Sequence, residues 1–213
     1  MTALAARARG LGTTVLAGEA LAAIELARDR EQLVAALAHA GVPADASPDA
    51  VDRCARDRVA RDLATLARWS SALALIELDE DRRSLRALVR GLAAGTGAGR
   101  RSAAAIATSS LPAGELAELA ALPTIDALAE RLARRGHPLA GALLVPHRAA
   151  APIDVLAIEI ALARGFTAAA ARAHVRDRAL GAYLAQVIDA ENAAAALLLA
   201  ERGAGLSAEH AFV

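Results

Sequence analysis

Leucine and isoleucine recur at spacings of three and four residues along most of the chain, and turn-forming segments separate these runs. This spacing is typical of amphipathic helices, whereas a strand needs strict alternation, and the few β-branched residues are scattered. The longest helical runs are predicted over about residues 48–78 and 152–188, the second interrupted near Gly165. Connections are predicted at 41–48, 95–99, 111–114, 134–141 and 150–154, which are rich in glycine or proline. The pattern predicts an all-α protein.

Composition supports the helical prediction. Alanine, the residue with the highest helix propensity, makes up more than a quarter of the chain, and leucine is close behind it in propensity. A core is expected where leucine and isoleucine line the inner helix faces. The expected core residues are Leu21, Ile24, Leu33, Leu37, Leu63, Leu66, Leu75, Leu85, Leu88, Leu119, Leu128, Leu132, Leu156, Ile160, Leu184 and Ile188.

The chain contains an internal repeat. A shift of 95 residues places 18–43 on 113–138, with the apolar positions and a final Gly-x-Pro coinciding. Each copy predicts a pair of short helices. Two helical repeat units are therefore expected, over about 1–100 and 101–213. The second copy stops at "SAEHAFV", where the first continues with "SSLPAGELAEL", so we expect the second unit to end at or within the start of a third repeat.

A second correspondence appears at a shift of 108 residues. It places Asp81 on Asp189 and Ser84 on Asn192, in each case ahead of small residues and leucine. Asp-x-x-Ser/Asn is typical of a helix start, where the aspartate caps the first free N–H groups. Arg90 and the glycine after it are expected at a helix C-terminus, where a cation and a left-handed residue are favourable.

Charge and cysteine content narrow the class of protein. The formal net charge is zero, with 24 basic and 24 acidic residues, and this balance argues against broad nucleic-acid binding. The single Cys54 has no partner for an internal disulfide, which fits a reducing compartment. No run reaches the roughly 18 uncharged apolar residues that span a bilayer, and no apolar signal segment follows the first arginines. We expect a cytoplasmic protein that meets a membrane only through partners.

The segment "GLAAGTGAGRRSAA", residues 91–104, resembles a phosphate-binding loop in its glycine content. A nucleotide-binding loop of that kind also needs a lysine and a preceding strand. The chain has no lysine, and no strand is predicted before residue 91. The segment is therefore interpreted as a linker between helices.

Acidic residues gather at Glu77, Asp79, Glu80 and Asp81 and can in principle hold Mg²⁺. We interpret them as ordinary carboxylates near a helix start, where they complement the helix dipole. The five histidines are dispersed, and no serine lies in a Gly-x-Ser-x-Gly turn. The sequence thus predicts no catalytic residue, no cofactor and no metal site.

The order of these elements resembles the C-type component of the V/A-type rotary ATPases, whose eukaryotic counterpart is the d component of the vacuolar ATPase. That family carries Asp-x-x-Asn-Leu-Arg-x-Leu-Leu-Arg, then a glycine linker and a Leu-Pro-Gly-Gly-like restart. The motif positions matched here are Asp81, Ser84 (in the Asn place), Leu85, Arg86, Leu88 and Arg90 in the first copy, and Asp189 and Asn192 in the second. The second copy departs from the motif, with Ala193 for Leu and Leu198 for Arg.

The resemblance implies a non-catalytic rotor part. In this family three similar helical domains form a funnel on the cytoplasmic face of the membrane proteolipid ring, and the central stalk inserts into it. The implied partners are therefore the proteolipid ring and the central-stalk subunits of an ion-transporting ATPase. Family members have three repeats and this chain has two. The alternative hypotheses are a stand-alone helical-repeat adaptor or degenerate fragment without a rotary role, and an all-α enzyme that uses the acidic cluster.

Overall fold

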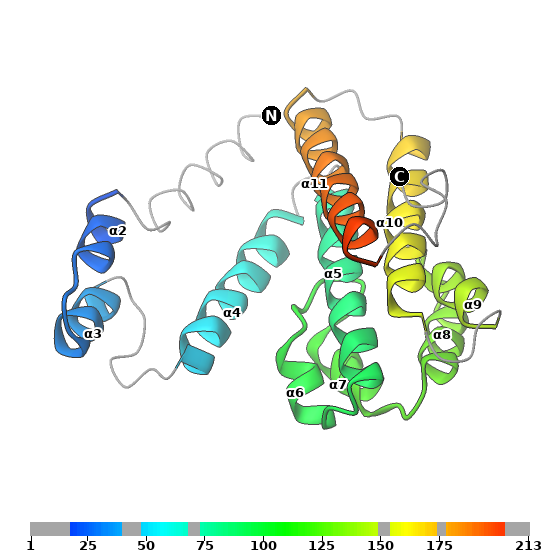
Figure 1. Ribbon diagram of the computed structural model, residues 1–213, viewed down its shortest axis with the longest axis horizontal. Helices are drawn as coiled ribbons and strands as arrows, with labels where there is room; N and C mark the ends of the chain where they lie inside the picture. Colours follow the sequence, from blue (N-terminus) through cyan, green and yellow to red (C-terminus); the bar gives the residue numbers. More distant parts are fainter. Residues whose placement is uncertain (1–17, 40–47, 68–72, 149–153, 174–177, 203–213) are drawn as a thin grey trace. The chain divides into compact units, whose positions relative to one another are not determined.

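The computed structural model describes residues 18–39, 48–67, 73–148, 154–173 and 178–202 (Figure 1). The predicted all-α class is confirmed, and these residues contain no strand. The helices are α2 (Gly18–Glu25), α3 (Arg30–His39), α4 (Pro48–Ala67), α5 (Ala74–Ala93), α6 (Ala98–Ala103), α7 (Ala113–Ala121), α8 (Ile125–Arg134), α9 (Ala140–Arg148), α10 (Val155–Arg172) and α11 (Arg178–Arg202).

The chain forms two compact units, Met1–Leu73 and Ala74–Val213. The boundary predicted near residue 100 falls inside the second unit, because α5 contacts both α6 and α10. The single helix predicted over 48–78 is wrong: α4 ends at Ala67 and α5 begins at Ala74, in the other unit. The predicted end of the second repeat, at 207–213, lies outside the described residues.

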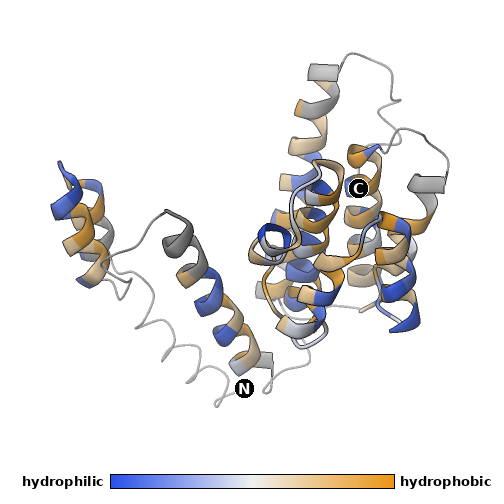
Figure 2. Ribbon diagram, turned by 90° about the horizontal axis from the view of Figure 1, so that it is seen from below, coloured by the Kyte–Doolittle hydropathy of each residue, from blue (hydrophilic) through white to orange (hydrophobic). Residues whose placement is uncertain are grey.

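The first unit contains α2, α3 and α4. Asp29 begins α3: its Oδ1 accepts a hydrogen bond from the Gln32 N–H at 2.8 Å, and Gln32 Oε1 accepts one from the Arg28 N–H at 3.1 Å. This reciprocal arrangement satisfies N–H groups that a helix start leaves free. Leu26 is 75% exposed and Leu33 is 38% exposed, and hydrophobic residues occupy much of this helix pair (Figure 2). The pair therefore keeps a large part of its apolar surface in contact with solvent.

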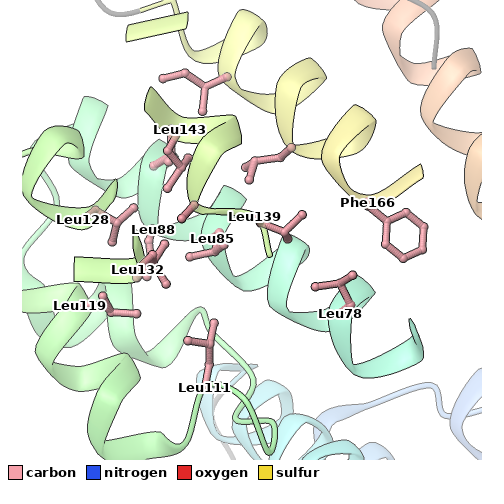
Figure 3. Close-up of a cluster of buried hydrophobic side chains, with 14 of the residues drawn as sticks. Leu78, Leu85, Leu88, Leu111, Leu119, Leu128, Leu132, Leu139, Leu143 and Phe166 are labelled. Atoms are coloured by element: carbon pink, nitrogen blue, oxygen red, sulfur yellow. The ribbon is translucent and has the colours of Figure 1, made fainter. Parts of the chain in front are cut away.

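The second unit is built around α5. α9 contacts α8 and α10, while α10 also contacts α5 and α11. Leu85 and Leu88 of α5 share one buried cluster with Leu119, Leu128 and Leu132 of α7 and α8, and all five side chains are fully buried (Figure 3). The hydrophobic effect thus joins helices that lie far apart in sequence.

The predicted core is confirmed in large part. The buried members are Leu63, Leu75, Leu85, Leu88, Leu119, Leu128, Leu132, Leu156 and Leu184. The partly buried members are Ile24, Leu37, Leu66, Ile160 and Ile188. Leu33 is exposed, and the side chain of Leu21 lies outside the description. The failures thus lie chiefly in the α2–α3 pair, whose apolar face the described residues of its own unit leave open.

The interruption predicted at Gly165 is wrong, because α10 runs through this residue without a break. A Cβ at Gly165 would lie 3.2 Å from Cδ2 of Leu139 and 3.5 Å from Cβ of Ala142. The glycine therefore serves close helix packing against α9 rather than a turn, because no side chain separates the two segments.

Candidate functional site

The residues of the family motif lie within two helices. Those of the first copy, Asp81, Ser84, Leu85, Arg86, Leu88 and Arg90, are on α5, and Asp189 and Asn192 are on α11. The prediction that both aspartates start helices is wrong, since α5 begins at Ala74 and α11 at Arg178. Arg90 does lie in the last turn of α5, as predicted. The left-handed position is Gly95, with φ of 65°, rather than the glycine next to Arg90.

The glycine-rich segment connects α5 to α6, as predicted for a linker. Arg101 crosses this connection and donates hydrogen bonds to the carbonyl oxygens of Ala120 (Nε, 2.8 Å) and Thr96. A Cβ at Gly91 would lie 2.6 Å from Cγ of Arg101. Gly91 therefore makes room for an arginine side chain that ties the linker to the end of α7.

Three arginines of α5 form the main polar feature of the second unit. Arg82, Arg86 and Arg90 are four residues apart and therefore lie on one face of the helix. They meet two carboxylates, Glu159 on α10 and Glu191 on α11. We call these five residues the charge brace.

Each carboxylate of the charge brace bridges two arginines. Glu159 Oε1 lies 2.5 Å from Arg90 Nε, and its Oε2 lies 2.8 Å from Arg90 Nη2 and 3.5 Å from Arg86 Nε. Glu191 Oε1 lies 2.7 Å from Arg82 Nη1 and 3.1 Å from Arg86 Nη1. Paired two-point contacts of this kind orient both groups and are stronger than single ones. The brace therefore links α5, α10 and α11.

Arg82 is the most enclosed member, with a side chain only 1% exposed. Its Nε and Nη2 donate to Asp79 Oδ1 at 2.9 and 2.7 Å, and its guanidinium carbon lies 5.5 Å from the centre of the Phe166 ring. Tyr183 of α11 donates to the other oxygen of Asp79 at 2.7 Å. Burial, followed by this contact with Asp79, raises the pKa of the Tyr183 hydroxyl well above its usual value. The phenol therefore stays a hydrogen-bond donor.

Burial alone would raise the pKa of the Glu191 carboxyl, but hydrogen bonds from Arg86 and Arg82 hold it below its ordinary value. Glu191 is thus an anion at neutral pH, as the charge brace requires. Because the arginines favour the ionised form, its contribution to stability is present above about pH 4.3 and is lost as the pH falls through the lowered value.

A second polar cluster surrounds Asp81 on another face of α5. Its carboxylate accepts hydrogen bonds from the hydroxyl groups of Thr108 and Ser110. His137 Nε2 lies 3.2 Å from Asp81 Oδ2, while His137 Nδ1 accepts the N–H of Leu139 at 3.2 Å. Because Nδ1 is an acceptor, Nε2 carries the proton in the neutral ring and donates to Asp81. Asp81 therefore binds a loop and the start of α9, not a helix terminus.

Two further residues of α5 bind the same loop. Glu77 accepts the hydroxyl of Ser109 at 2.6 Å, and the hydroxyl of Ser84 donates to the Ile106 carbonyl at 3.2 Å while accepting its N–H at 3.0 Å. The sequence does carry a signal for this contact. Glu77, Asp81 and Ser84 are spaced at four and three residues, so they form one polar stripe on a helix that is otherwise rich in leucine.

The acidic cluster diverges in space. Glu77 turns to the serine loop, Asp79 to Arg82 and Tyr183, and Asp81 to Thr108. Carboxylates at helix positions two residues apart point in different directions, so these oxygens do not converge on one point. In the part of the chain that the structure describes, no three metal-ligating side chains gather closely enough to hold a cation.

Glu80 provides a test of burial without a strong partner. Its carboxylate is 8% exposed, Arg83 Nη1 lies 3.3 Å from it, and burial raises the pKa of Glu80 above the ordinary value despite that arginine. A raised pKa in the folded state means that the ionised group disfavours folding at neutral pH. Glu80→Gln is therefore expected to increase the free energy of unfolding at pH 7, as measured by urea denaturation.

The increase should disappear below about pH 4, where the carboxyl of Glu80 is protonated in folded and unfolded chains alike. The matched control is Glu130→Gln, at an exposed position of α8, which should change stability little at either pH. A lower stability of Glu80→Gln at pH 7 would contradict the assignment.

Sequence reasoning missed Glu159 and Glu191. Both are single acids surrounded by apolar residues, in "VLAIEIALA" and "IDAENAAAA", and an isolated charge on a helix rich in alanine and leucine is the signal that was available. The motif residues of the second copy have another environment: Asp189 is exposed and Asn192 is partly buried. The structure therefore gathers the first copy, plus Glu159 and Glu191, and leaves the exposed Asp189 apart.

Comparison with known proteins does not assign the chain: no protein-family model matches it, and no curated protein matches it with significant similarity. Among the helices whose residues are described, none combines the length and apolarity that a bilayer crossing requires. What the described site can do is mechanical. Its charged groups are paired across helices and hold α5, α10 and α11 in register.

Proposed function

We propose that this chain is a non-catalytic socket component of a V/A-type rotary ATPase, placed between the central stalk and the membrane proteolipid ring on its cytoplasmic face. The proposal rests first on the resemblance of the Asp81–Arg90 segment and its repeat to the family motif. A part that passes torque needs rigid elements and complementary surfaces rather than a nucleophile or a tuned acid.

The charge brace is the observation that carries the proposal. Arg86 and Arg90, two charged positions of the motif, bind carboxylates on α10 and α11 instead of pointing to an open cleft. Ion pairs that are partly buried and made at two points resist sliding of one helix along another, because any shift breaks two hydrogen bonds at once. This use of the motif suits a rigid coupling element.

The test is affinity purification of the tagged chain from detergent-solubilised native membranes, with mass spectrometry of the recovered proteins. Proteolipid and central-stalk subunits should be recovered with it. The matched control is Leu88→Asp, which places a charge at a fully buried position and should prevent folding of the second unit. Recovery of the same subunits with this variant would indicate adhesion of an unfolded chain rather than assembly.

A stand-alone helical-repeat adaptor is the second candidate, favoured by the exposed leucines of the α2–α3 pair. The same experiment separates the two. If the chain is recovered without rotary subunits while a longer homologue occupies the ATPase, the rotor proposal is withdrawn.

A further inference from the structure

The internal repeat extends to the bounds of the helices. α3 covers Arg30–His39 and α8 covers Ile125–Arg134, so both ends are separated by the same 95 residues that relate the sequences. α2 and α7 likewise begin at Gly18 and Ala113. The α2–α3 and α7–α8 pairs are therefore two copies of one local structure.

The two copies differ in what covers them. Leu128 and Leu132 of α8 are fully buried against α5, in the cluster of Figure 3. Their counterparts in α3 are Leu33, which is 38% exposed, and Leu37, which is partly buried. Leu26, in the turn between α2 and α3, is 75% exposed. The α2–α3 pair thus carries the apolar face of α7–α8, but the described residues do not bury it to the same extent.

The covering helix also occurs twice, and its second copy is bare. At the shift of 108 residues, Leu88 and Val89 of α5 correspond to Ala196 and Leu197 of α11. The first two are fully buried, whereas Ala196 is exposed and Leu197 is 69% exposed. The opposite face of α11, with Glu191, is already occupied by the charge brace. One side of α11 is therefore bound and the other is open.

Repeat proteins stack each unit on its neighbours, and their terminal units normally present a polar outer face that stops further stacking. This chain instead has leucines at both open surfaces. The two surfaces are the separate halves of a contact that the chain already forms between α5 and the α7–α8 pair. We propose that the α2–α3 pair of one molecule docks on the exposed face of α11 of a second molecule, head to tail.

The occupant follows from complementarity that is visible within one chain. An α2–α3 pair matches α7–α8 in length and apolar positions, and α11 corresponds in sequence to α5, so a second copy supplies both missing partners. Such an interface is heterologous: the two molecules contribute different surfaces, and the contact either closes into a ring or extends. The inference is independent of the proposed rotary function.

The test is sedimentation equilibrium of the full chain over a range of concentrations. The wild-type protein should associate as its concentration rises. Leu33→Arg and Leu197→Arg each place a charge in one half of the contact and should weaken self-association by about tenfold or more. The control is Val59→Arg on α4, a position 40% exposed and outside both surfaces, which should associate like the wild type. Circular dichroism checks that all three variants remain helical.

A mixing experiment tests the head-to-tail geometry. A Leu33→Arg chain keeps an intact α11, and a Leu197→Arg chain keeps an intact α2–α3 pair, so an equal mixture can form one unmodified contact. Dimers should return in the mixture and stop at two molecules. A wild-type chain that stays monomeric at every concentration, a mixture that stays monomeric, or a Val59→Arg variant as impaired as the others would each overturn the proposal.

Discussion

Replacement of Arg82 by alanine is expected to lower the free energy of unfolding of the second unit by about 3–5 kcal/mol, the usual cost of removing one partner from a buried ion pair. The guanidinium is 1% exposed and binds Asp79, which is fully buried, and Glu191. Without Arg82 the Asp79 carboxylate stays in a water-poor site with Tyr183 as a donor but without its closest buried cation. Urea unfolding followed by far-ultraviolet circular dichroism measures the loss.

Arg83→Ala is the matched control for this measurement. Arg83 is the next residue on α5 and also contacts Asp79, at 2.9 Å, but its side chain is 52% exposed. Exposed pairs contribute at most about 1 kcal/mol, because water screens the charges and the long side chain loses freedom. Equal losses for the two variants would show that burial of Arg82 does not decide the stability of α5.

Replacement of Leu132 by alanine should produce the second large effect, a loss of about 2–5 kcal/mol. The side chain is fully buried on α8, in the cluster that includes Leu88 and Leu119. Truncation removes apolar contacts and leaves a cavity that helices held by several other leucines can fill only in part. Urea denaturation in dilute solution gives the change.

The matched control is Leu197→Ala on α11, where the side chain is 69% exposed. It should change the free energy of unfolding by no more than about 0.5 kcal/mol, as surface substitutions usually do. A similar loss at both positions would contradict the described core. Together the two leucine variants separate the buried face of the unit from the open one.

The arginine variants also bear on function. If α5, α10 and α11 must stay in register to pass force, Arg82→Ala should reduce recovery of rotary subunits in the affinity purification under conditions where the variant is still folded. Arg83→Ala should not. A binding-competent Arg82→Ala protein would restrict the role of the charge brace to stability.

Sequence periodicity was sufficient for the class of fold and for many of the core positions. Helix formation depends on residues three and four apart, so the apolar spacing around Leu85 and Leu128 and the turn at 134–141 could be found locally. The same local reasoning placed Asp81 and Asp189 at helix starts, and it was wrong. A capping pattern and a buried polar stripe use similar residue types, and only the neighbours of the helix distinguish them.

The sequence by itself determined that the chain is helical, that its helix pairs repeat, and that leucine faces must be covered. Only the tertiary structure decided which charges meet. Glu159 lies 69 residues from Arg90, and Glu191 lies 105 residues from Arg86. No spacing rule relates residues at such separations, because their approach depends on how whole helices pack rather than on the period of one helix. For the same reason burial of Leu132 and exposure of Leu33, which lie on equivalent helices of the repeat, became visible only in the folded chain.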